Sequence, residues 1–128
     1  MSGLGAGTGD WVILDRGRID QYKMLRPGFL ERLVAAYLSE SAGYMSKLRT
    51  SVPVGDLDGV RIAAHTLKSA SVNLGAMRVG EICKDMEAAA LGQDAASLAG
   101  LLSALGVEYF EAEQALRGVL MEAKAAVA

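Results

Sequence analysis

The spacing of small and apolar residues between positions 57 and 74 constrains the fold more than any other feature of this sequence. Steps of three and four residues connect Leu57, Val60, Ala64, Leu67, Ser71 and Leu74. Residues with this spacing lie along one face of an α-helix. Asp56 is suited to cap the helix at its start, and Gly75 suits a left-handed terminus. The segment is therefore predicted to be an amphipathic helix whose apolar face other helices must cover.

Two further helices are expected before this segment. Asp15 is suited to cap a short helix over residues 16–25. Pro27 fits the first turn of a second, longer helix, and Pro53 ends it. The apolar residues of that second helix keep the helical spacing at Leu30, Leu33, Tyr37, Tyr44 and Leu48.

Two more helices are expected after the segment, one ending before Gly92 and the other beginning near Asp94. The connections between the long helices are about two to six residues, a length that favours antiparallel neighbours. Aromatic residues make up only 5% of the chain, and the valines and isoleucines are scattered, so strand signals are weak. The expected fold is all-α, an antiparallel up-down four-helix bundle with a short extra N-terminal helix packed across one end.

The 128 residues, of which 52% are hydrophobic, can supply the core of one domain. We expect this domain to span residues 11–124. Residues 1–10 contain four glycines and no helical pattern, so we expect a disordered Gly-rich tail there.

Charge and composition argue against several classes of partner. Fifteen acidic and 13 basic residues are mixed along the chain and give a formal net charge of -2, whereas nucleic-acid binding calls for concentrated basic residues. No apolar run approaches the roughly 20 residues needed to cross a membrane. Cys83 is the only cysteine, and the N-terminus lacks the order of a signal peptide. We therefore expect a cytoplasmic monomer that binds neither nucleic acid nor membrane.

His65 is the only histidine, and it lies in the predicted helix over residues 57–74. One histidine and one cysteine cannot build a His/Cys metal site within one chain. No serine occupies a Gly-x-Ser-x-Gly turn, and a bundle with short loops offers little cleft, so a hydrolase is disfavoured. At about 100° per residue, His65 lies about 130° from the centre of the core face. The imidazole is therefore predicted to point outward.

The residues around His65 on this outer face indicate a binding surface. Ile62 and Ser69 lie about 170° from the core direction, and Val72 lies about 110° from it. Lys68 is one helical turn from His65, so its charge could meet a phosphoryl group on the imidazole. Ile62, Ser69 and Val72 form the predicted docking face for a partner.

The run from Ala64 to Ala76, AHTLKSASVNLGA, resembles the signature of histidine phosphotransfer (HPt) domains. That signature is His-x-x-Lys-Gly followed by a glycine six residues further on, and His65, Lys68 and Gly75 match it. Ser69 stands where most members have the first glycine. Because serine is nearly as small, this departure concerns partner preference more than chemistry.

The resemblance implies a carrier in a two-component phosphorelay. His65 would accept a phosphoryl group from one receiver-domain aspartate and yield it to another, and Lys68 would stabilise the phosphate. Response-regulator receivers and a sensor or hybrid histidine kinase would be the partners. The receivers would supply Mg²⁺, so the chain would need no cofactor or metal of its own. It would carry phosphate without autonomous kinase activity.

Glu87 and Cys83 lie in the helix that is expected to end before Gly92. Glu87 resembles the glutamate that supports the active histidine in the chemotaxis-kinase version of this domain, whereas Cys83 is expected to be a small apolar filler. A non-catalytic helical adaptor could bind or sequester a signalling partner, but it would have no need of His65 together with Lys68. The phosphoacceptor helix of a histidine kinase has an acidic residue directly after the histidine, whereas Thr66 follows His65 here.

Overall fold

The computed structural model describes residues 13–127, and the predicted tail over residues 1–10 lies outside them. The described residues form α-helices and one short 3-10 helix, with no strand among them. The α-helices are α3 (Arg16–Lys23), α4 (Phe29–Ser51), α5 (Leu57–Leu74), α6 (Met77–Leu91) and α7 (Leu98–Val127), and the 3-10 helix η1 (Ala95–Ser97) leads into α7. The predicted all-α class is confirmed.

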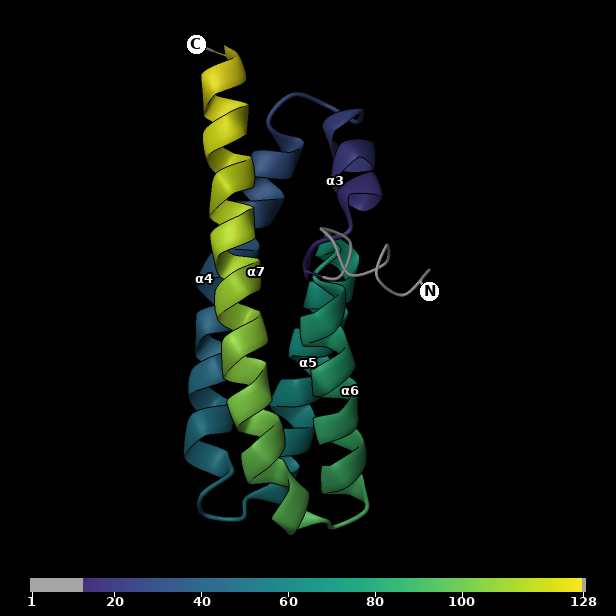
Figure 1. Ribbon diagram of the computed structural model, residues 1–128, viewed down its shortest axis with the longest axis vertical. Coiled ribbons are helices and arrows are strands. Elements are labelled where there is room, and N and C mark those ends of the chain that lie inside the picture. The colour runs from purple at the N-terminus through teal and green to yellow at the C-terminus, as the bar shows by residue number, and fades with distance from the viewer. Residues whose placement is uncertain (1–12, 128) are drawn as a thin grey trace, which may run out of the picture.

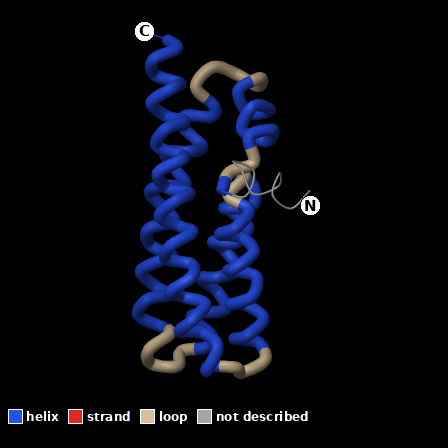
Figure 2. Tube along the Cα trace, in the orientation of Figure 1, coloured by secondary structure: helices blue, strands red, loops and turns tan. Residues whose placement is uncertain are grey.

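The four long helices run alternately up and down, as Figure 1 shows. Figure 2 shows their connections, in tan, gathered towards the ends of the helices. α5 packs against α4 and α6, and α7 closes the bundle against the same two helices. The largest fully buried side chains of the shared core include Met45, Leu48, Leu67, Leu74, Met86, Leu105 and Leu116. The antiparallel four-helix bundle expected from the sequence is the observed fold.

α5 carries the predicted core face. Asp56 caps this helix, because its Oδ1 accepts a hydrogen bond from the backbone N–H of Gly59 at 3.0 Å. Gly75 ends it with a φ of +91°, a left-handed conformation that glycine adopts without steric cost. The buried stripe consists of Gly59, Val60, Ala63, Ala64, Leu67, Ser71 and Leu74. The opposite face of α5 therefore meets solvent.

Two pairs of hydroxyl groups lie inside the apolar core. Tyr37 Oη and Ser71 Oγ are hydrogen-bonded at 2.7 Å and connect α4 to α5. Ser41 Oγ and Tyr109 Oη, also at 2.7 Å, connect α4 to α7. Burial raises the pKa of Tyr37 far above its ordinary value, so this phenol stays protonated. Each hydroxyl has a partner, which offsets the cost of removing it from water.

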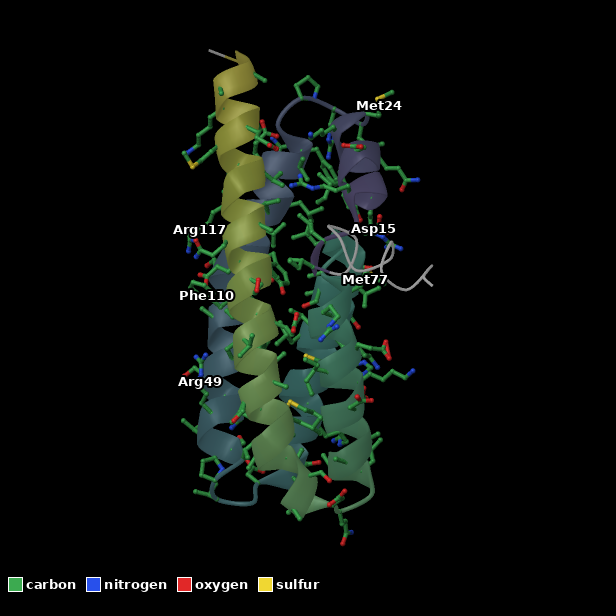
Figure 3. The ribbon with its side chains drawn as sticks, in the orientation of Figure 1. Asp15, Met24, Arg49, Met77, Phe110 and Arg117 are labelled. Atoms are coloured by element: carbon green, nitrogen blue, oxygen red, sulfur yellow. The ribbon has the colours of Figure 1, made fainter. Side chains whose placement is uncertain are left out.

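The short helix α3 lies beside the end of the bundle where α5 ends and α6 begins (Figure 1). The backbone N–H of Asp15 donates to the Gly75 carbonyl at 2.7 Å, and Tyr22 Oη donates to the Asn73 carbonyl at 2.7 Å. Figure 3 shows Asp15 just above Met77, the first residue of α6. A Cβ on Gly75 would lie 3.1 Å from the backbone of Asp15, so the glycine permits this close approach.

Three helix boundaries differ from the predicted ones. Pro27 lies before α4 rather than in its first turn, because the N-cap is Gly28 with a left-handed φ of +80° and the helix begins at Phe29. α3 ends at Lys23 rather than near residue 25, because Pro27 disfavours helical geometry at the residue before it and the chain must reverse to enter α4. Asp94 caps η1 rather than α7, since its Oδ1 accepts from the Ser97 N–H at 3.3 Å. One tight turn therefore precedes α7, which begins at Leu98.

Candidate functional site

His65 lies near the middle of α5, on the face opposite the buried stripe. Its side chain is 60% exposed, whereas Ala64 and Leu67 are fully buried. The neighbouring core residues anchor this part of the helix, while the imidazole reaches solvent. The orientation agrees with the one predicted from the helical spacing.

Glu87 on α6 connects His65 to Lys68. Its Oε2 lies 2.8 Å from His65 Nδ1, and its Oε1 lies 2.7 Å from Lys68 Nζ. One carboxylate on α6 thus contacts two side chains that are one turn apart on α5. The side chains of Lys68 and Glu87 are 28% and 17% exposed, so this ion pair is partly shielded from water. The structure therefore brings together the three residues assigned to the chemistry in the sequence analysis.

The charge of Glu87 determines how the imidazole is oriented. The hydrogen bond from Lys68 lowers the pKa of Glu87, partial burial opposes this shift, and the hydrogen bond with His65 adds to it. Glu87 is thus a carboxylate at neutral pH and can only accept hydrogen bonds. His65 Nδ1 must then be the donor, which leaves a lone pair on Nε2 of the neutral ring. Nε2 has no hydrogen-bond partner within residues 13–127, so it is available to react.

The three residues of the predicted docking face are not equally exposed. Ile62 is 54% exposed, and Ser69 is also exposed. Val72 is only partly exposed, and its Cγ2 faces Gly80 of α6, where a Cβ would lie 2.6 Å from that methyl group. The expected strip of exposed residues is therefore interrupted at Val72. The angular position of a residue on one helix does not reveal where a second helix covers it.

Ile62 also borders a groove between α4 and α5. The groove has a volume of about 370 Å³, and its lining includes Tyr44 and Lys47 of α4 and Thr66 of α5. Thr66 directly follows His65 in the chain. The surface beside the histidine therefore extends from Ile62 towards α4 and offers both apolar and charged groups to a partner.

Cys83 lies on α6, one turn before Glu87, and is fully buried. Burial raises the pKa of its thiol to about 12. A thiol that is protonated and shielded from solvent is a poor nucleophile. Its environment fits the small apolar filler expected from the sequence.

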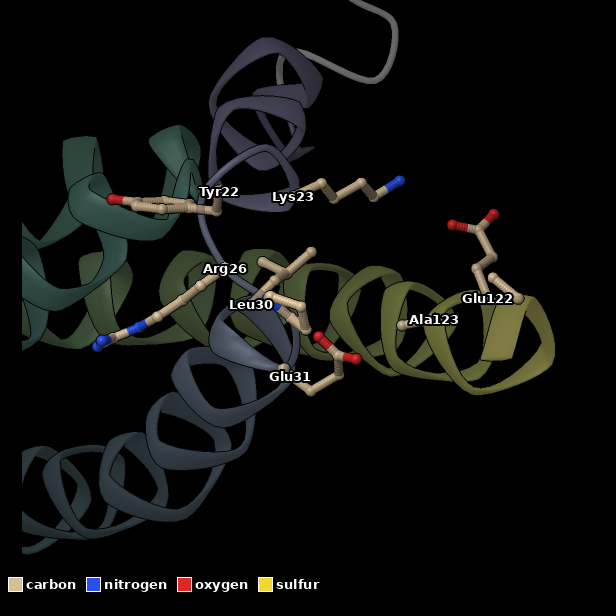
Figure 4. A pocket seen from close by; sticks show the side chains of 10 residues that line it. Tyr22, Lys23, Arg26, Leu30, Glu31, Glu122 and Ala123 are labelled. Carbon is tan, nitrogen blue, oxygen red and sulfur yellow. The ribbon is translucent and has the colours of Figure 1, made fainter. Parts of the chain in front are cut away.

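Another groove lies at one end of the bundle, between the end of α3, the start of α4 and the last turns of α7 (Figure 4). It has a volume of about 270 Å³, and its charged lining combines Lys23 and Arg26 with Glu31 and Glu122. None of the site residues predicted from the sequence lines it. Charges of both signs in an open groove do not select one ligand, so the site around His65 remains the candidate.

Metal binding and membrane insertion have no candidate elements in the described part of the chain. Residues 13–127 contain no group of three or more His, Cys, Asp or Glu side chains placed to hold a metal ion. No helix within the same range has the length and apolar character needed to span a membrane.

Sequence reasoning missed two features of the site. The helical spacing places Lys68 beside His65 but does not predict its ion pair with Glu87. Nor does the sequence indicate that Gly80 faces Val72 beside the site. Both features depend on the register between α5 and α6, and a single sequence contains no signal that pairs residues on two antiparallel helices.

The described residues thus form a four-helix bundle that presents one exposed histidine, hydrogen-bonded through Nδ1 and without a partner at Nε2 among residues 13–127. The profile of the Hpt domain matches residues 32–123. The chain therefore belongs to the Hpt domain family. The matched region runs from α4 into α7 and includes His65, Lys68 and Glu87.

Solved structures of histidine-containing phosphotransfer proteins share this fold. The protein HptB from Pseudomonas aeruginosa PAO1 aligns with a TM-score of 0.82 and 19% identity, over 86% of this chain and 96% of its own. ZmHP2 from maize aligns with a TM-score of 0.80 and 19% identity, over 98% of this chain and 94% of its own. No curated protein matches the sequence.

Proposed function

We propose that His65 carries the phosphoryl group of a two-component phosphorelay. Members of the Hpt family are phosphotransfer carriers that interact with histidine kinases and response regulators, and this chain is one of them. His65 is its only histidine. The observation that carries the residue assignment is the 2.8 Å contact between Glu87 Oε2 and His65 Nδ1, because it leaves the Nε2 lone pair exposed on the same ring.

The transfer follows from this arrangement. The Nε2 lone pair attacks the phosphorus of an aspartyl phosphate on a donor receiver, a nitrogen–phosphorus bond forms, and the phosphorus–oxygen bond to the aspartate breaks. The aspartate leaves as a carboxylate. The ring becomes positively charged while Nδ1 keeps its proton, and the Glu87 carboxylate stabilises that charge. The reverse attack by an acceptor aspartate restores the neutral ring.

Lys68 adds positive charge beside the reacting atom. Glu87 holds its ammonium group at 2.7 Å, which limits the conformations of a long, flexible side chain. An ammonium has three donors, so two remain for the oxygens of a phosphoryl group. We assign Lys68 to phosphate stabilisation and Glu87 to orientation of the imidazole.

The surface on which a receiver docks determines where its aspartate lies relative to His65. Ile62 and Ser69 are the exposed residues that flank His65, and the groove beside Ile62 extends this surface towards α4. We propose that a receiver domain binds here and supplies Mg²⁺, while the chain contributes the nucleophile, the local charges and the surface. Positioning and charge stabilisation then account for the reaction without kinase activity of the chain itself.

The test is incubation of the purified protein with a receiver that carries ³²P on its aspartate. We expect label on this chain that is labile in acid and stable in base, as a phosphohistidine is. The matched variant His65→Gln should remain unlabelled and keep the helical circular dichroism spectrum, because an exposed side chain contributes little to packing.

Two results would contradict the proposal. Label on folded His65→Gln would show that another residue accepts phosphate. Receiver binding without any label on the wild-type protein, with several receivers tested, would instead favour a non-catalytic adaptor.

A further inference from the structure

Gly80 of α6 packs directly against Val72 of α5, next to the site. An added Cβ at Gly80 would lie 2.6 Å from Val72 Cγ2 and 3.8 Å from the Lys68 carbonyl oxygen. Two carbons in van der Waals contact are about 3.5 to 4.0 Å apart, so any side chain at position 80 would require roughly 1 Å of movement. The two helices can therefore lie this close only while residue 80 has no side chain.

This contact shares a face with the catalytic contacts. On α6, Gly80, Cys83 and Glu87 are separated by three and four residues, and on α5, His65, Lys68 and Val72 have the same spacing. The helices are antiparallel, so Val72 faces Gly80 two turns from the place where His65 faces Glu87. A change of helix spacing at one contact is transmitted along the rigid helices to the other.

We propose that the Gly80–Val72 contact sets the separation of α5 from α6 and thereby holds Glu87 within hydrogen-bonding distance of His65 and Lys68. Gly80 is then a positioning residue for phosphotransfer, and the proposal rests on the function proposed above. Val72 acts through packing on α6, rather than only as part of the docking face.

The stiffness of valine makes the contact effective as a spacer. In a helix, a valine side chain strongly prefers one χ1 rotamer, so Val72 cannot readily rotate its methyl group away from a new Cβ. The Lys68 carbonyl behind it belongs to the α5 backbone. Gly80→Ala would therefore push α5 and α6 apart. A larger separation weakens the hydrogen bonds of Glu87 with His65 and Lys68, which are 2.8 and 2.7 Å long.

The test compares Gly80→Ala with Val72→Ala/Gly80→Ala in the full chain. The readout in the unphosphorylated protein is the tautomer of His65, obtained from the imidazole ¹⁵N chemical shifts by NMR. We expect the wild type to hold the proton on Nδ1, and Gly80→Ala to move towards the tautomer population of Glu87→Ala. The double variant removes the opposing methyl groups and should return to the wild-type population.

The kinetic readout is the transfer rate constant at saturating phosphorylated receiver, with the receiver Kd measured separately. Gly80→Ala should lower the rate constant by on the order of a hundredfold, which is the cost of a shift of about 1 Å in a reacting group, and should leave Kd unchanged. The double variant should recover the rate.

Gly118→Ala is the matched control. Gly118 is an exposed residue of α7, and among residues 13–127 no atom beyond its own turn of helix lies within 4 Å of an added Cβ, so this variant should match the wild type in tautomer and rate. The proposal would be overturned if folded Gly80→Ala kept the wild-type tautomer population. It would also be overturned if Val72→Ala/Gly80→Ala failed to return to that population.

If Gly80→Ala does not fold, the test of the spacer role rests on the double variant alone. A folded double variant with the wild-type tautomer supports the spacer role, whereas an unfolded or tautomer-shifted one contradicts it. The NMR readout does not require phosphate transfer. A failure of the phosphorelay function would therefore appear as an unlabelled wild type, separately from any result on Gly80.

Discussion

Lys68 Nζ lies 2.7 Å from Glu87 Oε1, so the lysine of α5 is paired with a carboxylate of α6 before any phosphoryl group arrives. A phosphoryl group on His65 would add negative charge beside this pair and share the ammonium with Glu87. The ion pair with Glu87 therefore restricts the position of the Lys68 ammonium group. We expect its contribution to transfer to depend on the position that Glu87 imposes on it.

Lys68→Ala should slow phosphotransfer and shorten the lifetime of the phosphohistidine, because it removes the nearest cation. The cost to the free energy of unfolding should be below about 1 kcal/mol, as for other ion pairs near the surface. The measurements are a transfer time course and the half-life of the label. Lys84→Ala, at an exposed position of α6, is the control for loss of one positive charge. Equal transfer by Lys68→Ala and wild type would remove Lys68 from the mechanism.

Glu87→Gln should change the pH dependence of stability. The pKa of Glu87 is lowered in the folded protein, so its contribution to stability is present above the ordinary carboxyl pKa and is lost as the pH falls through the folded-state value. The difference in unfolding free energy between wild type and variant should therefore shrink as the pH falls below about 4. Urea denaturation at a series of pH values between about 3 and 7, a range that spans the ordinary carboxyl pKa, measures this difference in unfolding free energy. A difference that grows on acidification would contradict the assignment.

Ser69→Arg should block docking of the receiver while the bundle still folds. Ser69 is exposed one turn from His65, so a long side chain there should not disturb the packing of the core. The same side chain would occupy the space through which the receiver aspartate is expected to approach. Misplacement of the reacting groups by even about 1 Å costs on the order of a hundredfold in rate. A phosphotransfer time course, with helicity checked by circular dichroism, tests this. Normal transfer by folded Ser69→Arg would place the docking surface elsewhere.

Ser69→Gly is the conservative partner of that variant. It should retain transfer because it keeps the site small, although a glycine inside a helix lowers stability by roughly 0.5 to 1 kcal/mol. Thermal denaturation would record that loss. Slow transfer by this variant would indicate that the serine hydroxyl itself has a role.

Tyr37→Phe should destabilise the bundle by about 1 to 2 kcal/mol, because it leaves the buried Ser71 hydroxyl without its partner. Adding Ser71→Ala should recover part of the loss, since it removes the unpaired hydroxyl. Urea denaturation midpoints of the single and double variants measure both effects. Tyr44→Phe is the control, because the Tyr44 hydroxyl has no hydrogen-bond partner within residues 13–127. Full stability in Tyr37→Phe would show that the pair contributes nothing to the fold.

Local sequence patterns were sufficient to predict the helices and the exposure of His65. The three-four spacing over residues 57–74 predicted both the buried stripe of α5 and the outward direction of His65, because both follow from the geometry of one helix. Asp15, Asp56 and Gly75 indicated helix ends, since caps depend on residues within one turn. The boundary near Asp94 was less accurate because a 3-10 turn and an α-helix begin with the same capping residue.

The amino-acid sequence by itself therefore determined the all-α class, the antiparallel bundle and the exposed histidine with a lysine one turn away. Only the tertiary structure decided that Lys68 is paired with Glu87 and that Val72 packs on Gly80. A resemblance suggested Glu87 as a partner of His65, but no spacing rule placed it there. The physical reason is that periodicity and capping act within one helix, whereas the register and separation of α5 and α6 result from the packing of residues far apart in the chain.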